Sequence, residues 1–355
     1  MKQDRQRRVP PKREVTIYDV ADQADVSIST VSNVLNRPER VAATTRERVL
    51  AVADTLGYVP KADAVSKARQ AMRRVGVLAP FTSYRSYLER LAGLLQEARG
   101  SGTEVAVFDH ESAATASSPF LASMPIRGQV DGLVVMGMRV EGAIERRLWD
   151  RRVPTVVVDA DSERFPVVTC DDRVGGELAA KHLLELGHRR FGYVVERQTA
   201  PYPSQALARL EGFRASLGKC RGTSLQVVEA GSSPASARDA AMKLLSCPGR
   251  STAVMAHCDD LAFGVLMAAS DLGISVPEQL SVVGCDDGPG AEAAGLTTVH
   301  QPLRESGSIA LRSLLGMING AGFERTVTYL PLQFVERSTT CPVVPGTRRR
   351  RVSAG

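Results

Sequence analysis

The stretch TIYDVADQADVSISTVSNVLN, residues 16–36, contains two short helical patterns separated by three residues. Thr16 and Asp19 form a capping-box pattern that predicts the start of a helix, and apolar residues follow at helical spacing up to residue 24. Asp25 belongs to the few residue types that tolerate a left-handed backbone, and Ser27 is a good N-cap for a second helix. The stretch therefore predicts two helices joined by a tight turn.

A third helix is expected over residues 44–56, because Thr44 and Glu47 form another capping-box pattern and Gly57 suits a C-terminal cap. Two short helices buttressed by a third make a helix-turn-helix. The second helix has a polar outer face, and a major groove about 12 Å wide admits such a helix. The alternative is a small helical bundle without a DNA role.

The charge of the chain is unevenly distributed. Residues 1–74 hold 15 Lys and Arg against 9 Asp and Glu, whereas residues 75–355 hold 30 of each. A cationic head on a neutral body is typical of a nucleic-acid-binding module, although a basic segment can also be a solvated tail. The basic residues 1–14 and the run Arg348–Arg351 are expected to be disordered.

Composition excludes several classes of protein. With 355 residues, of which 43% are hydrophobic, the chain can bury a sizeable core, and no stretch approaches the ~20 apolar residues of a membrane span. No secretory signal follows the basic N-terminus, so we expect a cytoplasmic protein. The six cysteines form no CxxC pair, and no metal or other cofactor is expected. The phosphate-binding, nucleophile-elbow and HExxH motifs of enzymes are missing, so we expect no enzyme.

From residue 75 onward, short apolar runs alternate with amphipathic helical patterns. This alternation predicts an α/β body of doubly wound parallel sheets, and the number of βα units favours two lobes over one. In such sheets ligands bind outside the carboxyl ends of the strands. The expected strands are residues 75–79, 104–108, 132–136, 154–158, 191–195, 225–228, 253–256 and 280–284.

Motifs along most of the chain resemble the LacI/GalR (lactose/galactose repressor) family of bacterial transcription regulators. In the head these are VTIYDVA (15–21), VSISTVS (26–32), Asn36, Thr45-Arg46 and GYVP (57–60). In the body they include DDxxGG (171–176), HLxxLGHRR (182–190), RxxGF (209–213), VPxxxSVVGxDD (276–287), TTVxQP (297–302) and ERST (336–339). The resemblance implies a periplasmic-binding-protein-like body with a small-molecule effector between its lobes.

The resemblance also implies DNA-contacting positions. Ile28, Ser29 and Asn33 would read bases, and Asn33 would favour adenine. The segment 61–71 matches the hinge helix of the family, but Lys67 stands at the position of its minor-groove leucine. A lysine cannot act as an apolar wedge, so this hinge is expected to bind DNA more by charge. The polar residues suited to phosphate contacts or to capping are Thr16, Tyr18, Ser27, Ser32 and Asn36. In the hinge, Lys61 stands where the family usually has Asn, and Ala64 fits the family pattern.

The family's effector positions fall mainly on Arg209 and Asp286 of this chain. Arg209 could bond hydroxyls in a forked manner, and Asp286 could accept from hydroxyls. An ion-pair network between lobes is the alternative for both. Asp172 and Asp259 add carboxylates that suit sugars and disfavour anions. The weaker candidates are Phe81 and Tyr87, which could equally belong to the core.

Together these features predict a homodimeric transcriptional regulator, a repressor that reads a pseudo-palindromic DNA operator and responds to a sugar-like effector. A transport-type sugar-binding protein or an enzyme on the same fold are the alternatives. The expected parts are a disordered basic arm (1–14), a helix-turn-helix DNA-binding domain (15–60), a hinge segment (61–74), a two-lobed effector-binding and dimerisation domain (75–340) and a basic disordered tail (341–355).

Overall fold

The structure, a computed structural model, describes residues 15–58, 73–110, 130–198, 204–322 and 324–343. The expected basic arm, residues 61–72 of the expected hinge and residues 344–355 of the expected tail lie outside these ranges. The described residues fall into two compact units. The first unit holds residues 15–58, 73–74, 130–131 and 141–153, and the second holds the remainder.

The N-terminal helices pack around a small apolar core. Val20, Val31, Val34 and Val49 are fully or almost fully buried there, as the helical spacing predicts. The third helix begins at Ala43, and no side chain caps it, so the expected capping box of Thr44 is wrong. Its N-cap is Ala42, so Thr44 lies inside the helix and not at its cap. The elements are α1 (Ile17–Gln23), α2 (Ile28–Asn36), η1 (Pro38–Arg40) and α3 (Ala43–Leu56).

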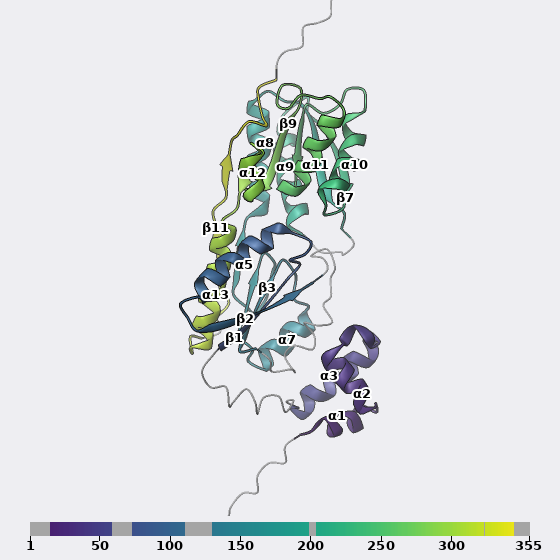
Figure 1. Ribbon diagram of the computed structural model, residues 1–355, viewed down its shortest axis with the longest axis vertical. Coiled ribbons are helices and arrows are strands. Elements are labelled where there is room, and N and C mark those ends of the chain that lie inside the picture. The colour runs from purple at the N-terminus through teal and green to yellow at the C-terminus, as the bar shows by residue number, and fades with distance from the viewer. Residues whose placement is uncertain (1–14, 59–72, 111–129, 199–203, 323, 344–355) are drawn as a thin grey trace, which may run out of the picture. The chain divides into compact units, whose positions relative to one another are not determined.

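Two six-stranded sheets form the rest of the described chain (Figure 1). Sheet A has the order β11-β5-β4-β3-β1-β2, and sheet B has the order β12-β10-β9-β8-β6-β7. Neighbouring strands whose register is described run parallel, except that β12 runs antiparallel to β10. The strands are β1 (Arg73–Ala79), β2 (Thr103–Asp109), β3 (Gly132–Met136), β4 (Thr155–Val158), β5 (Val167–Cys170), β6 (Arg190–Glu196), β7 (Ser224–Ala230), β8 (Ala253–Ala256), β9 (Ser281–Asp286), β10 (Thr297–His300), β11 (Val327–Leu330) and β12 (Gln333–Val335).

Four of these strands, namely β5, β10, β11 and β12, were not among the expected ones. Each has only three or four residues and is not buried along its whole length, whereas the equally short β4 and β8 are fully buried and form unbroken apolar runs. All eight expected strands are present, with bounds shifted by at most two residues. The α/β prediction, a helix-turn-helix region followed by two lobes built on parallel sheets, is confirmed.

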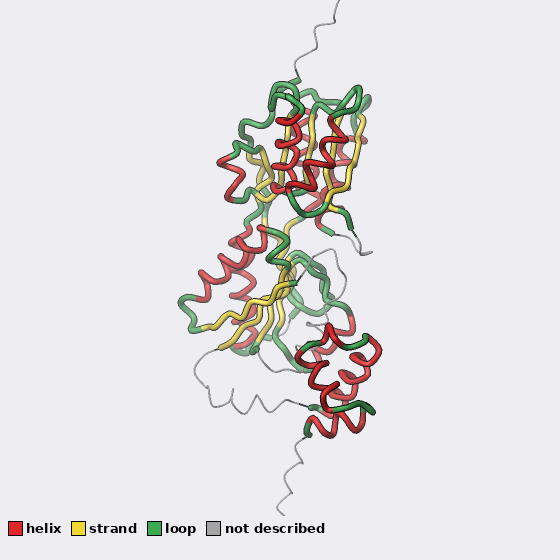
Figure 2. Tube along the Cα trace, turned by 45° about the vertical axis from the view of Figure 1, so that its right-hand side comes forward, coloured by secondary structure: helices red, strands yellow, loops and turns green. Residues whose placement is uncertain are grey.

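Side chains that alternate along each strand bury both faces of sheet B. Tyr193 and Met255 face α8 and α9, whereas Val194 and Val254 face α10 and α11. A strand covered on both faces reads as an unbroken apolar run, which is the pattern seen in the sequence. Figure 2 shows the strands of each lobe side by side with helices beside them. The helices are α5 (Arg85–Ala98), α7 (Gly142–Asp150), α8 (Asp172–Glu185), α9 (Gln205–Gly218), α10 (Pro234–Leu245), α11 (Asp259–Asp271), α12 (Pro289–Ala293) and α13 (Leu303–Ile318).

Close packing of α8 against α9 depends on two glycines. A Cβ atom at Gly176 would lie 1.9 Å from the carbonyl oxygen of Arg209, and one at Gly212 would lie 2.0 Å from that of Arg173. Real Cβ atoms do not approach so closely, so only glycine allows this helix separation. The pair therefore fixes where the side chain of Arg209 emerges.

Candidate functional site

The turn between α1 and α2 is fixed by local side-chain bonds. The Asp19 carboxylate accepts hydrogen bonds from the amide (2.7 Å) and the hydroxyl (2.6 Å) of Thr16. Asp25 adopts φ 50°, the left-handed conformation expected of it. The Ser27 hydroxyl accepts from the amide of Thr30 at 3.1 Å and so caps α2. As a result, α2 begins at Ile28 with its first turn exposed.

The outer face of α2 presents the expected base-reading side chains. Ile28 is 42% exposed, and Ser29 and Asn33 are also exposed. An isoleucine held in solvent at the start of a polar helix face has no role in the core, which suits contact with a thymine methyl group. Within the described residues, the N-terminal turn of α2 therefore presents an exposed surface.

The residues expected to contact phosphates surround this surface. Tyr18 is 66% exposed, Ser27 is exposed, and Thr16 and Ser32 are partly buried. Capping and DNA contact remain compatible for Thr16 and Ser27, because each side chain is on the surface. The side chain of Asn36 and the residues Lys61, Ala64 and Lys67 lie outside the described part of the structure.

A pocket lies between the two lobes of the second unit, at the carboxyl ends of their strands. Both sheets reverse their strand order here, between β1 and β3 in sheet A and between β6 and β8 in sheet B, which is where open α/β sheets bind ligands. Lobe A contributes Tyr84, Arg85, Ser86, Tyr87, Arg90 and Asp159, and lobe B contributes Glu196, Gln198, Ser204, Gln205, Ala206, Arg209, Ser232, His257, Cys258, Asp260 and Asp286. Gln301 lies in the segment between β10 of sheet B and the helix at Leu303–Ile318.

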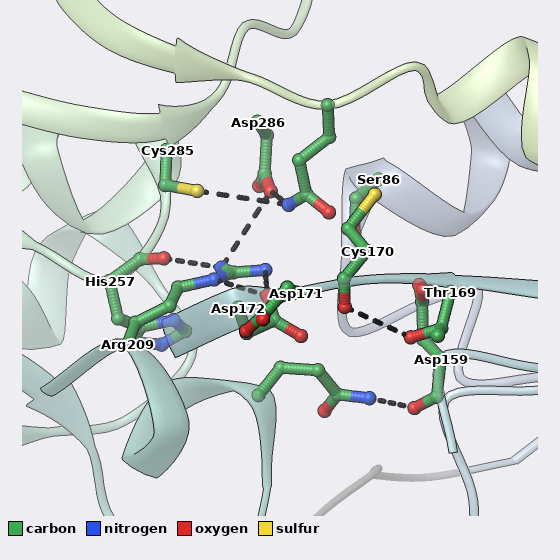
Figure 3. Close-up of polar contacts among 12 residues, drawn as sticks. Ser86, Asp159, Thr169, Cys170, Asp171, Asp172, Arg209, His257, Cys285 and Asp286 are labelled. Atoms are coloured by element: carbon green, nitrogen blue, oxygen red, sulfur yellow. Dashed lines mark hydrogen bonds and ion pairs between the residues drawn. The ribbon is translucent and has the colours of Figure 1, made fainter. Parts of the chain in front are cut away.

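Arg209 on α9 contacts three polar groups at the pocket (Figure 3). Its guanidinium pairs with Asp172 at 2.7 Å and donates to the carbonyl oxygen of His257 at 2.6 Å. A second carboxylate, that of Asp286, lies 3.9 Å away. The side chain is only 7% exposed, so these partners replace the water that a free guanidinium would hold.

Asp286 lies at the end of β9 with φ 126°, a conformation that favours glycine. Its carboxylate accepts from the Gln301 side-chain amide at 2.6 Å, and burial raises its pKa. Strained backbone held in place by surrounding bonds is common at functional sites. On the lobe A side, Arg90 pairs with Asp159, and both side chains are buried.

Among the described residues, the polar contacts that join the lobes across the pocket include two hydrogen bonds and one ion pair. The Tyr84 hydroxyl donates to Glu196 at 2.5 Å, Arg85 lies 3.6 Å from Asp260, and the Gln205 amide donates to the carbonyl oxygen of Asp159. Burial raises the pKa of both Glu196 and Asp260. The separation of the lobes is therefore coupled to polar groups that a ligand would contact.

The structure brings three of the expected effector residues, Tyr87, Arg209 and Asp286, to the pocket wall, with Asp172 directly behind Arg209. It does not bring Phe81 there, which packs in the core of lobe A. Asp259 does not line this pocket either. Both of its oxygens are engaged, one by the Thr298 hydroxyl at 2.6 Å and one by the Gly288 amide at 2.9 Å.

Sequence reasoning missed several wall residues, above all Arg90, Glu196 and His257. The loops after β1, β6 and β8 were expected to reach the site, and two of these residues lie in or beside them. Arg90 was missed because it sits within α5, where an arginine in a helical stripe normally faces solvent.

Searches of the described residues found no group of three or more His, Cys, Asp or Glu side chains able to hold a metal ion. Within the same described ranges, no helix combines the length and hydrophobicity required to cross a bilayer.

Comparisons with known proteins agree with this architecture. Residues 16–61 match the family described as bacterial regulatory proteins, lacI family, and residues 180–340 match a periplasmic binding protein-like domain. A curated relative, the HTH-type transcriptional repressor PurR of Edwardsiella ictaluri, is 32% identical over 91% of this chain and 96% of its own.

Two solved structures are also similar. A LacI family transcriptional regulator of Enterococcus faecium with bound ribose is 28% identical, with a TM-score of 0.69 over 77% of this chain and all of its own. A Lac repressor dimer bound to operator and the anti-inducer ONPF is 27% identical, with a TM-score of 0.64 over 93% of this chain and all of its own. With a matching head, a matching body and a relative that aligns from end to end, the chain belongs to the lacI family of bacterial regulatory proteins, a family of transcriptional regulators.

Proposed function

We propose that this protein is a transcriptional repressor that binds a pseudo-palindromic operator as a homodimer and changes its DNA affinity when an uncharged sugar or related polyol occupies the pocket. One observation carries the proposal. The chain combines an exposed, capped helix face suited to a major groove with a separate pocket built around the buried guanidinium of Arg209.

The DNA-binding half of the proposal is supported by the first turn of α2. Ile28, Ser29 and Asn33 are exposed on one side of a helix that starts at a tight turn. Asn33 can pair with N6 and N7 of adenine in two hydrogen bonds, whereas an arginine at this position would prefer guanine. The operator half-site should therefore contain an adenine opposite Asn33.

The dimer is supported by the architecture of a relative. The similar Lac repressor was solved as a dimer bound to its operator. A twofold-symmetric dimer carries two identical heads, and two identical heads require two inverted half-sites. We therefore propose that the operator is pseudo-palindromic.

The class of effector is supported by the charge of the pocket. Among the described residues, three arginines and four carboxylates line it, and each of those arginines already forms an ion pair with a lining carboxylate. An anionic ligand would find no spare cation, whereas hydroxyl groups could donate to the carboxylates. The similar Enterococcus faecium regulator holds ribose, which fits this class.

The proposed function is tested by fluorescence anisotropy with the full-length protein. A duplex selected from random sequence serves as operator, and D-ribose, D-glucose, D-galactose and cellobiose serve as effectors. We expect nanomolar, salt-dependent binding to a two-half-site duplex and a change in affinity with at least one sugar.

The control is Asn33→Ala, which should lose preference for the selected sequence and keep non-specific binding. Sugar binding without any DNA binding would instead favour the transport-type protein, and turnover of a sugar would favour an enzyme.

A further inference from the structure

Unpaired polar atoms in the described core gather at one place. Five buried side-chain atoms have no hydrogen-bond partner, and four of them belong to residues of the pocket wall. These four are Nε of Arg90, Oε1 of Gln198 and both ring nitrogens of His257, while the fifth is the hydroxyl of Tyr193, which does not line the pocket. Buried polar groups are almost always paired in folded proteins, so a group of unpaired ones at a pocket indicates a missing partner.

His257 is the strongest member of this group. Its residue is only 6% exposed, yet neither ring nitrogen has a partner in the described structure. It directly follows β8, at the point where sheet B reverses its strand order. Its backbone is held by the Arg209 guanidinium on its carbonyl oxygen (2.6 Å) and by the carbonyl of Val194 on its amide (3.0 Å). The backbone of His257 is thus held in place, while its ring nitrogens have no hydrogen-bond partner among the described residues.

The imidazole at this position is neutral. Burial, together with the neighbouring positive charge of Arg209, lowers the pKa of His257 to about 3. A neutral imidazole carries one donor and one acceptor nitrogen. A hydroxyl group both donates and accepts, so a ligand with hydroxyls can pair with either nitrogen, whereas a phosphate oxygen can only accept.

We propose that His257 is a specificity-determining contact of the effector, whose neutral imidazole bonds a hydroxyl group and selects an uncharged sugar over its phosphate ester. The inference rests on the proposed function and deepens its effector site. The surrounding charges act in the same direction, because the four lining carboxylates outnumber the three lining arginines, and each of these arginines is already paired with one of the carboxylates.

A first experiment needs no ligand and uses the full-length protein. His257→Phe keeps a ring of similar shape and removes both unpaired nitrogens. If the His257 ring nitrogens lack partners until a ligand binds, the ligand-free His257→Phe variant should unfold about 2 °C above the ligand-free wild-type protein. The reason is that the variant no longer buries an unsatisfied polar group. A fall in the unfolding temperature would show that the imidazole stabilises the fold, and it would overturn the proposal. If the phenylalanine variant does not fold, the smaller His257→Leu takes its place.

A second experiment measures thermal shifts with D-ribose, D-glucose, D-galactose and cellobiose, and with the phosphate monoesters of the first three. We expect at least one free sugar to stabilise the wild-type protein and its phosphate ester to bind about tenfold or more weakly. His257→Phe should weaken the sugar by about tenfold, and His257→Gln, which keeps a donor and an acceptor, should restore part of that loss.

Tyr193→Phe is the matched control. It also removes an unpaired buried polar atom, but one that does not line the pocket, so it should leave the sugar-induced shift unchanged. Equal binding of sugar and phosphate ester, or full binding by His257→Phe, would overturn the proposal. If no sugar stabilises the wild-type protein, the proposed effector class fails, while the ligand-free measurement still decides whether His257 is a structural residue.

Discussion

Removal of the Arg209 guanidinium should strongly destabilise the protein. Arg209 contacts Asp172 at 2.7 Å, donates to the carbonyl oxygen of His257 at 2.6 Å and lies 3.9 Å from Asp286. The side chains of Arg209 and Asp172 are only 7% and 10% exposed, so Arg209→Met would leave a buried carboxylate without its counter-charge. Breaking a buried pair from one side costs about 3–5 kcal/mol.

The assay is urea unfolding of the full-length protein in a double-mutant cycle with Asp172→Asn. Because the second substitution removes the stranded charge, the double variant should recover about 1–3 kcal/mol relative to the sum of the single losses. Arg173→Met is the control, since Arg173 forms an exposed pair with Glu211, neither residue lines the pocket, and the loss of this pair should barely move the midpoint. A loss below about 1 kcal/mol for Arg209→Met, or strict additivity in the cycle, would refute the assignment of Arg209 as the main buried counter-charge.

Four further predictions concern DNA binding, effector response and packing. Asn33→Ala should cost about 1–3 kcal/mol on the selected operator and little on duplexes in which the opposing adenine is replaced, as anisotropy titrations with both duplexes will show. Lys67→Leu, at the expected hinge, should strengthen operator binding and lower the slope of log K against log salt by about 0.9, and a slope that does not change would mean that this residue makes no phosphate contact. Asp286→Asn tolerates the same positive φ but lacks the charge, so effector affinity in a thermal-shift titration should fall about tenfold while operator affinity without effector is retained. Gly176→Ala should destabilise the protein by about 1–3 kcal/mol in urea, because its Cβ would meet the carbonyl oxygen of Arg209 at 1.9 Å, and a neutral result would contradict the close approach of α8 and α9.

The head is the part of the protein that sequence reasoning predicts best. Its caps, its left-handed Asp25 and its apolar stripe are local features, and each acts within a few residues of itself. The exception is the start of α3. The capping-box pattern predicts Thr44 as the N-cap, whereas the helix begins at Ala43. Helix ends are set by small energy differences, so their exact residue is poorly specified by pattern.

The long strands of the body and the fully buried short ones could also be predicted, because burial on both faces leaves an uninterrupted apolar run. The short, partly exposed strands could not. β11 and β12 pair with strands far away in the chain, and each contributes at most four residues. Their sheet pairing depends on partners that no local window contains.

The residues of the candidate site also fall into those that local sequence predicts and those that only tertiary packing places. By itself the sequence determined the three-helix head and the two-lobed α/β body, and it named Arg209 and Asp286 as candidate effector contacts, because helix caps, strand runs and family motifs are local patterns of neighbouring residues. Only the tertiary structure decided that Asp259 bonds Thr298 and Gly288 instead of the pocket, that Phe81 is core, and that Arg90 and His257 reach the pocket wall. These outcomes depend on which strand ends meet in space and on which polar atoms find partners there, and both are properties of the packed chain.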